Sequence, residues 1–184
     1  MFSGTPKGKL SDIATIIMGQ SPDGKTYNSD GNGMPFYQGK TEFGDLYIGE
    51  PVTWTTAPSR VAEENDVLMS VRAPVGSTNI ATQKCCLGRG LAAIRAIPSK
   101  STTLFILHSM RSIETEIENM GVGSTFKAIN KEQVYNLPIP IANLELQSRF
   151  VALAEQSDKS KFELQEAIEN LKNLLKSLLK QDSE

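Results

Sequence analysis

The apolar residues of this chain follow two different patterns. Up to residue 143, short apolar runs such as Ile13–Met18 and Leu91–Ile97 are separated by segments rich in glycine and proline. Short apolar runs between turn-forming residues are typical of β-strands. The pattern predicts an α+β fold, in which a compact, strand-rich domain with one or two short helices spans residues 1–143.

Two segments of this first domain depart from the strand pattern. Thr102–Met120 carries apolar residues at helical spacing and is followed by Gly121, which suits the C-cap of a helix. Leu137–Ile141 reads Leu-Pro-Ile-Pro-Ile, and each proline lacks an amide donor and favours an extended residue before it. We therefore predict a helix at Thr102–Met120 and an edge strand or extended connector at Leu137–Ile141.

The second pattern begins at Leu144. Leu144–Gln181 contains neither glycine nor proline, and Asn143 is suited to cap the N-terminus of a helix. Such a helix would be roughly 55 Å long. This length argues against an amphipathic helix folded back on its own domain. We predict that residues 144–184 form a long coiled-coil helix, whose heptad seam includes Leu164, Ile168, Leu171, Leu175 and Leu178.

Charge is distributed unevenly along this helix. Acidic residues occupy its middle and lysines its C-terminal end. An antiparallel second copy that crosses near Ile168 would bring Lys172 and Lys176 of one chain near Glu163 and Glu166 of the other. The pattern therefore predicts a homodimer through antiparallel C-terminal helices.

Overall composition excludes some classes of protein and leaves DNA binding open. The 19 lysines and arginines are balanced by 21 acidic residues, so any nucleic-acid binding must rest on a locally basic face. No apolar run approaches the roughly 20 residues that span a bilayer, and the first residues lack the apolar core of a signal peptide. We expect a cytoplasmic protein with no membrane contact.

Residues suited to catalysis or metal binding are sparse. The two cysteines, Cys85 and Cys86, are neighbours, which suits neither a loop-closing disulfide nor a four-ligand zinc site. His108 is the single histidine and falls within the predicted helix. We therefore predict no catalytic residue and no metal site in this chain.

One segment matches a nucleotide-binding motif in form. Gly19–Thr26 reads GQSPDGKT, which fits the P-loop pattern. A phosphate-binding loop of this kind opens a helix, whereas Tyr27–Pro35 has the composition of a loop. Nucleotide binding by the P-loop mechanism remains an alternative that the local sequence disfavours.

Polar segments bracketed by glycine are the remaining candidates for a binding site. Glycine allows a backbone to approach a ligand closely, and short hydroxyls, amides and lysines are the groups that contact phosphates or base edges. Each segment could equally be an ordinary turn. The four segments are Gly19–Pro22, Pro35–Phe43, Ser70–Gly76 and Gly123–Ile129.

The order of these segments resembles the target-recognition domain of type I restriction-modification specificity subunits. The resemblance extends over nearly the whole chain, from Leu10, Asp12 and Ile13 ahead of the GQSP turn to the Leu-Glu-Leu-Gln sequence that opens the long helix. Between them lie PFYQGKTEFG, DVLMSVRAPVG, CLGRGLAAI and GSTFKAINKEQVYNLPIPI. Full-length members of this family carry two recognition domains and two conserved helices, whereas this chain has one of each.

The resemblance implies that the glycine-bracketed segments contact DNA. We expect Lys40, Arg72, Arg89 and Lys127 to donate to phosphates or bases, although Arg72 and Arg89 could instead form structural ion pairs. Shorter polar contacts to DNA are expected from Gln20, Ser21, Gln38, Ser124 and Thr125.

The resemblance also implies partners. A half-length subunit that dimerises would read a bipartite site in double-stranded DNA and direct an adenine methyltransferase and an ATP-dependent restriction subunit to it. S-adenosylmethionine, ATP and Mg²⁺ would belong to those partners, and no cofactor is expected in this chain.

Other interpretations stay open at this point. The chain could be a fragment of a longer specificity subunit, or a recognition domain detached from a fused restriction-methylation enzyme. A structural coiled-coil adaptor and a P-loop nucleotide-binding protein are further alternatives.

Overall fold

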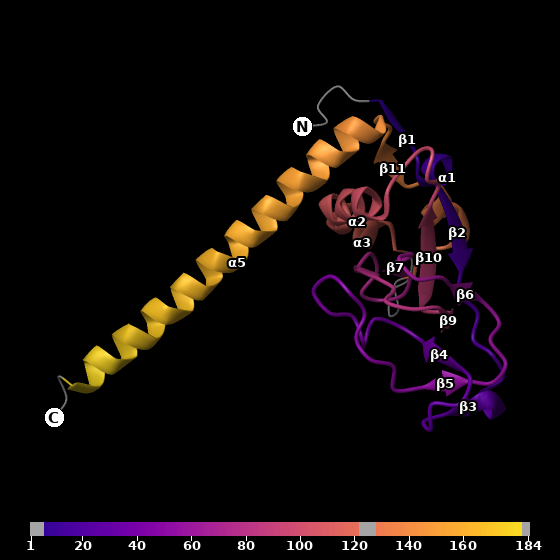
Figure 1. The fold of residues 1–184 in the computed structure, drawn as a ribbon, viewed down its shortest axis with the longest axis horizontal. Helices are drawn as coiled ribbons and strands as arrows, with labels where there is room; N and C mark the ends of the chain where they lie inside the picture. Colours follow the sequence, from indigo (N-terminus) through magenta and orange to yellow (C-terminus); the bar gives the residue numbers. More distant parts are fainter. Residues whose placement is uncertain (1–5, 122–127, 182–184) are drawn as a thin grey trace.

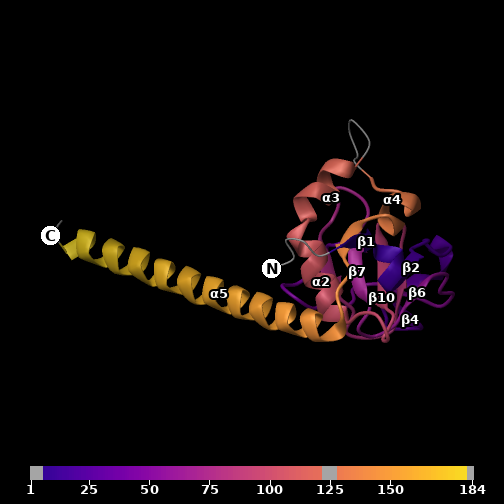
Figure 2. The ribbon, with the colours of Figure 1, turned by 90° about the horizontal axis from the view of Figure 1, so that it is seen from above.

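The computed structural model describes residues 6–121 and 128–181, with side chains as far as Lys176 (Figure 1). A domain of two larger sheets, one two-stranded sheet and several short helices carries one long helix that projects from it (Figures 1 and 2). This arrangement confirms the predicted α+β fold class. No helix in the described ranges combines the length and apolar character that crossing a membrane requires.

A four-stranded antiparallel sheet forms the centre of the domain. Its order is β2 (Ala14–Met18), β10 (Leu91–Ala96), β7 (Val67–Ser70) and β8 (Thr78–Ile80). Successive side chains of a strand point to opposite faces of the sheet. Accordingly, Val67 and Met69 of β7 pack in one apolar cluster and Leu68 in another. Both faces of this sheet are therefore covered, which explains why its strands are apolar runs rather than alternating sequences.

The second sheet packs against one of these faces. Its order is β3 (Tyr27–Asn28), β5 (Trp54–Thr55), β4 (Met34–Tyr37), β9 (Cys85–Leu87) and β6 (Val61–Ala62). β4 and β9 run parallel, and their neighbours are antiparallel. Tyr37 and Leu87 of this sheet share a buried cluster with Leu68 and Ala93 of the first sheet. Cys85 and Cys86 are buried free thiols within β9.

Helices cover the other face of the central sheet. α2 (Thr103–Ser112) lies there, and Phe105, Ile106 and Met110 are fully buried in the larger core cluster. α3 (Glu114–Met120) follows α2, and Gly121 is its C-cap, as predicted. Two shorter helices complete the domain, α1 (Leu10–Ile13) and α4 (Lys131–Tyr135).

The single helix predicted for Thr102–Met120 is wrong in one respect, because it is interrupted at Ile113. Ile113 has φ of −119° and ψ of 17°, outside helical values. The hydroxyl of Ser112 donates to the carbonyl of Ser109, a local bond that competes with helix continuation. On either side of the interruption, Ile117 is buried in the core and Ile113 packs against it.

The segment rich in proline forms an edge strand, one of the two forms predicted for it. β11 (Pro138–Pro140) pairs antiparallel with β1 (Lys7–Lys9) in a separate two-stranded sheet. The two-stranded sheet leads directly to the long helix α5 (Leu144–Gln181). The side chain of Asn143 accepts a hydrogen bond from the amide of Leu146 at 2.9 Å, which confirms the predicted N-cap.

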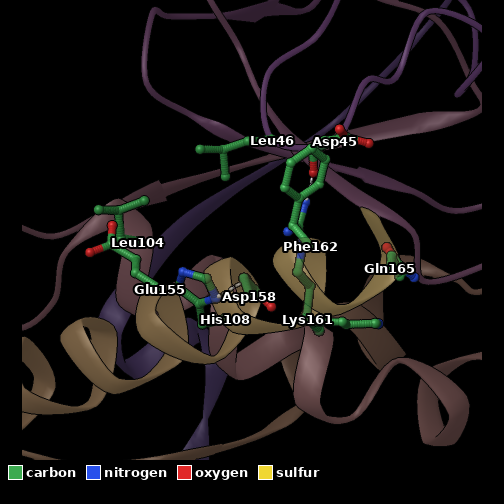
Figure 3. A pocket seen from close by; sticks show the side chains of 10 residues that line it. Asp45, Leu46, Leu104, His108, Glu155, Asp158, Lys161, Phe162 and Gln165 are labelled. Carbon is green, nitrogen blue, oxygen red and sulfur yellow. Dashed lines mark hydrogen bonds and ion pairs between the residues drawn. The ribbon is translucent and has the colours of Figure 1, made fainter. Parts of the chain in front are cut away.

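The first turns of α5 are fixed to the domain. Gln147 is fully buried, and its Nε2 donates to the carbonyls of Lys100 and Ala142 at 2.7 and 2.8 Å. Val151 is buried in the larger core cluster, and Phe150 packs edge-on against Phe105 of α2. Asp158, two turns farther on, still lies 3.9 Å from His108 of α2, and both residues line the pocket drawn in Figure 3. Beyond this part α5 leaves the domain surface (Figures 1 and 2).

Candidate nucleic-acid interface

Three loops from different parts of the sequence meet where β2 ends. The amide of Gly19 donates to the carbonyl of Leu91, and that of Gln20 to the carbonyl of Leu87, both at 2.9 Å. The amide of Gly88 donates to the carbonyl of Tyr37 at 2.8 Å. The loops after β2 and β4 are therefore both attached to the β9–β10 turn.

Glycine is required at this meeting point because the backbones touch. A Cβ atom on Gly19 would lie 2.1 Å from the carbonyl oxygen of Gly88, and one on Gly90 would lie 2.3 Å from that of Gln38. Both distances are far shorter than any permitted contact. We call Gly19, Gly88 and Gly90, together with the loops they join, the glycine junction.

The glycine junction brings four of the predicted DNA-contacting residues onto one surface. Gln20, Gln38 and Arg89 are exposed at the junction. Ser21 is half-buried beside them, and its Oγ accepts a hydrogen bond from the amide of Arg89 at 3.4 Å. Residues separated by up to 68 positions in the chain are thus neighbours.

Arg72 joins the same surface through the end of β7. The amide of Val71 donates to the carbonyl of Gly90 at 2.9 Å, which places Arg72 next to the junction. Arg72 also forms an isolated antiparallel bridge with Ala128. Lys40 lies farther along the β4 loop, where its Nζ is 3.4 Å from the hydroxyl of Ser77.

Three of the predicted contacts lie outside the described residues. These are Ser124, Thr125 and Lys127. Their segment resumes at Ala128, the bridge partner of Arg72. Their role in DNA binding stays a prediction.

The structure adds two residues that the sequence analysis missed. Ser59 donates its hydroxyl proton to the carbonyl of Gln20, and the carbonyl of Arg60 accepts from the amide of Leu87 at 2.8 Å. Arg60 is exposed next to the junction. No glycine brackets the segment Thr56–Arg60, so the sequence pattern that identified the other loops could not have found it.

The cations of this surface differ from the structural arginines of the domain. Arg95 makes a bidentate ion pair with the buried carboxylate of Asp66, at 2.9 and 2.8 Å. By contrast, within the described part of the chain no ion pair engages Lys40, Arg60, Arg72 or Arg89. The alternative that Arg72 and Arg89 form structural ion pairs therefore gains no support from the described residues. Such unpaired, exposed cations are suited to bind phosphate oxygens.

The P-loop alternative does not fit the geometry of its segment. Gly24–Thr26 forms the three-residue 3₁₀ helix η1, and β3 follows it instead of an α-helix. The amide of Lys25, which a phosphate would need, donates to the Asp23 carboxylate at 3.0 Å. In residues 6–121 and 128–181 there is also no group of three or more histidines, cysteines or acidic residues that could hold a metal ion.

A second candidate surface is the apolar seam of α5. Leu164, Ile168, Leu171 and Leu175 are 62%, 45%, 65% and 58% exposed. Exposure of this size shows that the domain does not cover these predicted seam residues. The side chain of Leu178, the fifth predicted seam residue, lies outside the described part of the chain.

Comparison with known proteins identifies the family. The family model described as type I restriction modification DNA specificity domain matches residues 4–173. The chain belongs to this family. The resemblance that the glycine-bracketed segments indicated is thereby confirmed.

Individual relatives support the same assignment for this specificity domain. It is 42% identical over 167 residues to the putative type I restriction enzyme MjaX specificity subunit of Methanocaldococcus jannaschii, an alignment that covers 87% of the chain. The crystal structure of the HsdS subunit from Thermoanaerobacter tengcongensis matches 90% of the chain with 44% identity and a TM-score of 0.79. A structure described as the basis of complex assembly and conformational transition of the type I R-M system matches 96% with 44% identity and a TM-score of 0.85.

The fold extends to a more distant protein. The type I restriction-modification S subunit from M. genitalium has a TM-score of 0.65 at 15% identity, which shows a shared fold. The specificity domain described here spans 39% of the M. jannaschii relative, and 40% and 44% of the two structures that are 44% identical to it. It therefore corresponds to less than half of each of these proteins.

Proposed function

We propose that this chain recognises double-stranded DNA through the surface around the glycine junction. The observation that carries the proposal is the convergence on one surface of short polar side chains and of cations that form no ion pair with any described residue. Lysines and arginines would bind phosphates and set the position of the domain on the duplex. Base edges would be contacted by the short polar side chains next to the glycine junction, which are Gln20, Ser21 and Gln38.

The DNA site that this chain recognises would be the site at which partner subunits act. As in the family to which the chain belongs, we propose that it directs an adenine methyltransferase and an ATP-dependent restriction subunit to DNA in the cytoplasm. S-adenosylmethionine, ATP and Mg²⁺ would be bound by those partners.

We further propose that two copies pair through antiparallel α5 helices. The exposed apolar seam and the acidic-to-basic polarity of the helix support this arrangement. A two-fold dimer would present two identical recognition domains, so its bipartite target would consist of inverted repeats.

DNA binding can be tested with a variant that carries Lys40→Ala, Arg72→Ala and Arg89→Ala. Each cation that contacts a phosphate releases about one counterion, so we expect the slope of log affinity against log salt to fall by about 3. Fluorescence anisotropy with duplex DNA over a salt series measures this slope. The protein would be assayed with and without the proposed partner methyltransferase.

The control removes the same charge elsewhere, with Lys7→Ala, Lys84→Ala and Lys100→Ala. These lysines belong to β1, the β8–β9 turn and the loop before α2. We expect the control to keep the wild-type slope. Equal slopes for the two triple variants would refute the assignment of the DNA-binding surface.

A further inference from the structure

The segment Thr56–Arg60 joins β5 to β6 and is exposed along its whole length. It is nevertheless attached to the domain at both ends. The amide of its first residue donates to the carbonyl of Thr26 at 3.1 Å, and the carbonyl of its last residue accepts from the amide of Leu87 at 2.8 Å. Pro58 in its middle has a fixed φ and favours extended geometry in the residue before it. These features hold an exposed segment in a defined position.

Leu87 of β9 places this segment beside Gln20. The carbonyl of Leu87 accepts from the amide of Gln20 at 2.9 Å, while the amide of Leu87 donates to the carbonyl of Arg60. The amide and the carbonyl of one strand residue point to the same side of the strand. Gln20 and Arg60 therefore lie next to each other along one edge of β9, although they are distant in the sequence.

Ser59 makes a second contact with Gln20. Its hydroxyl donates to the carbonyl of Gln20, so that the amide and the carbonyl of Gln20 are both engaged. Backbone groups held in this way fix the direction in which the Gln20 side chain leaves the chain, before any DNA is bound. Base recognition depends on this direction, because the donors and acceptors of a base edge occupy fixed positions in the groove of the duplex.

Arg60 supplies a positive charge next to Gln20. It is exposed, and no ion pair engages it among the residues that the structure describes. A free guanidinium is suited to bind a phosphate through two parallel hydrogen bonds. Phosphate contacts set the register of a protein on the duplex, whereas base contacts carry the sequence information. A phosphate held by Arg60 would keep the neighbouring Gln20 at one base pair.

We infer that Thr56–Arg60 is a further DNA-recognition segment, in which Arg60 binds a phosphate and Ser59 is a positioning residue for Gln20. Ser59 acts on base preference through Gln20 and does not itself contact the base. The inference rests on the proposed DNA-binding surface. It adds to that surface a segment without glycine that sets the base preference of Gln20.

Base preference tests the role of Ser59. Duplexes that the wild type and Ser59→Ala select from a randomised DNA library would be sequenced, with and without the proposed partner methyltransferase. Ser59→Ala should lower the preference at one base pair of the selected site about tenfold and leave the other base pairs unchanged, because it releases a single carbonyl. Ser59→Thr keeps the hydroxyl and should keep the wild-type preference. Urea denaturation of both variants should resemble that of the wild type, since Ser59 is exposed.

A double variant shows whether Ser59 acts through Gln20. Gln20→Ala should lose the preference at the same base pair. In that background Ser59→Ala should change nothing further, because residues that act as one unit are not additive. A further loss on addition of Ser59→Ala would overturn the positioning role.

Salt dependence tests Arg60. Arg60→Ala should lower the slope of log affinity against log salt by about 1, as expected for one phosphate contact. Arg60→Lys keeps the charge and should keep the slope. Lys7→Ala, which removes a positive charge from β1, should also keep the slope.

These measurements separate the inference from the proposed function. The variant with Lys40→Ala, Arg72→Ala and Arg89→Ala reports on the DNA-binding surface as a whole. If its salt slope falls, but Ser59→Ala keeps the wild-type base preference or Arg60→Ala keeps the wild-type slope, the inference is overturned and the surface stands. If this triple variant and Arg60→Ala both keep the wild-type slope, the inference and the proposed surface are both overturned.

Discussion

At the scale of single residues, the absence of side chains at the glycine junction determines where the DNA-contacting groups lie. Gly90 touches the carbonyl of Gln38 closely enough that a methyl group would overlap it, whereas nothing lies within 4 Å of a Cβ on Gly39. Gly90→Ala would therefore push apart the loops that carry Gln38 and Arg89. We expect it to cost about 2 kcal/mol of unfolding free energy and to weaken DNA binding.

Gly39→Ala is the matched control, since it makes the same chemical change in the facing loop, next to Gln38. We expect it to alter the unfolding free energy by no more than about 0.5 kcal/mol. Urea denaturation of both variants measures the difference. If Gly90→Ala were as stable as Gly39→Ala, the backbone contact would not determine the position of these loops.

Most residues at the glycine junction could be predicted from the sequence, and Arg60 could not. Gln20, Gln38, Arg72 and Arg89 were predicted because glycine next to polar residues is visible in a linear sequence. Arg60 was missed because its place at the junction depends on pairing between β6 and β9, which are distant in sequence. The residues next to Arg60 in the sequence include no glycine that would have indicated a binding loop.

At the scale of elements, the contact between α2 and α5 contains the one histidine of the chain. Burial lowers the pKa of His108, and this outweighs the nearby carboxylate of Asp158, which raises the pKa; Arg111 lowers it and Glu155 raises it. The Nδ1 of His108 is 3.9 Å from the Asp158 carboxylate, while its buried Nε2 has no hydrogen-bond partner among the described residues. The folded protein thus favours the neutral ring.

A pH dependence of stability follows from this environment. The unfolded chain binds a proton at His108 with a pKa of about 6.5, whereas the folded chain takes it up only at lower pH. The free energy of unfolding should therefore fall as the pH drops below about 6.5 and level off below the folded pKa. Urea denaturation between pH 7.5 and 5 measures this.

His108→Gln, which cannot titrate, should flatten the same profile. Because the chain has no other histidine, the difference between the two profiles reports this residue. Identical slopes in the two proteins would contradict the assigned environment of the ring.

Elements were predictable to different degrees for physical reasons. The start of α5 at Leu144 was predicted because Asn143 and the following long stretch without glycine or proline are local signals. The interruption at Ile113 was not, since the apolar spacing continues through it and gives no sign of the hydrogen bond from Ser112 to the carbonyl of Ser109. The parallel pairing of β4 with β9 was equally invisible, because it joins residues about 50 positions apart.

At the scale of the whole molecule, the two candidate surfaces lie on different parts of the chain and can be disabled separately. Ile168→Asp would place a charge in the centre of the α5 seam, where pairing would have to bury it. We expect this variant to be monomeric in light scattering at concentrations where the wild type is a dimer.

Asn173→Asp introduces the same charge on the same helix, at the heptad position farthest from the seam. This control should dimerise like the wild type. Both variants should keep the unfolding behaviour of the domain, since neither residue contacts its core. A dimeric Ile168→Asp protein would refute pairing through the seam.

The buried side-chain amide of Gln147 couples the orientation of α5 to the orientation of the domain. Because that side chain bonds to two carbonyls at the base of the helix, a rotation of the domain would turn the base of the helix with it. A rod of 38 residues is about 57 Å long, so a tilt of roughly 5° at its base moves its far end by about 5 Å. Small movements of the domain are therefore magnified at the distant tip of the helix.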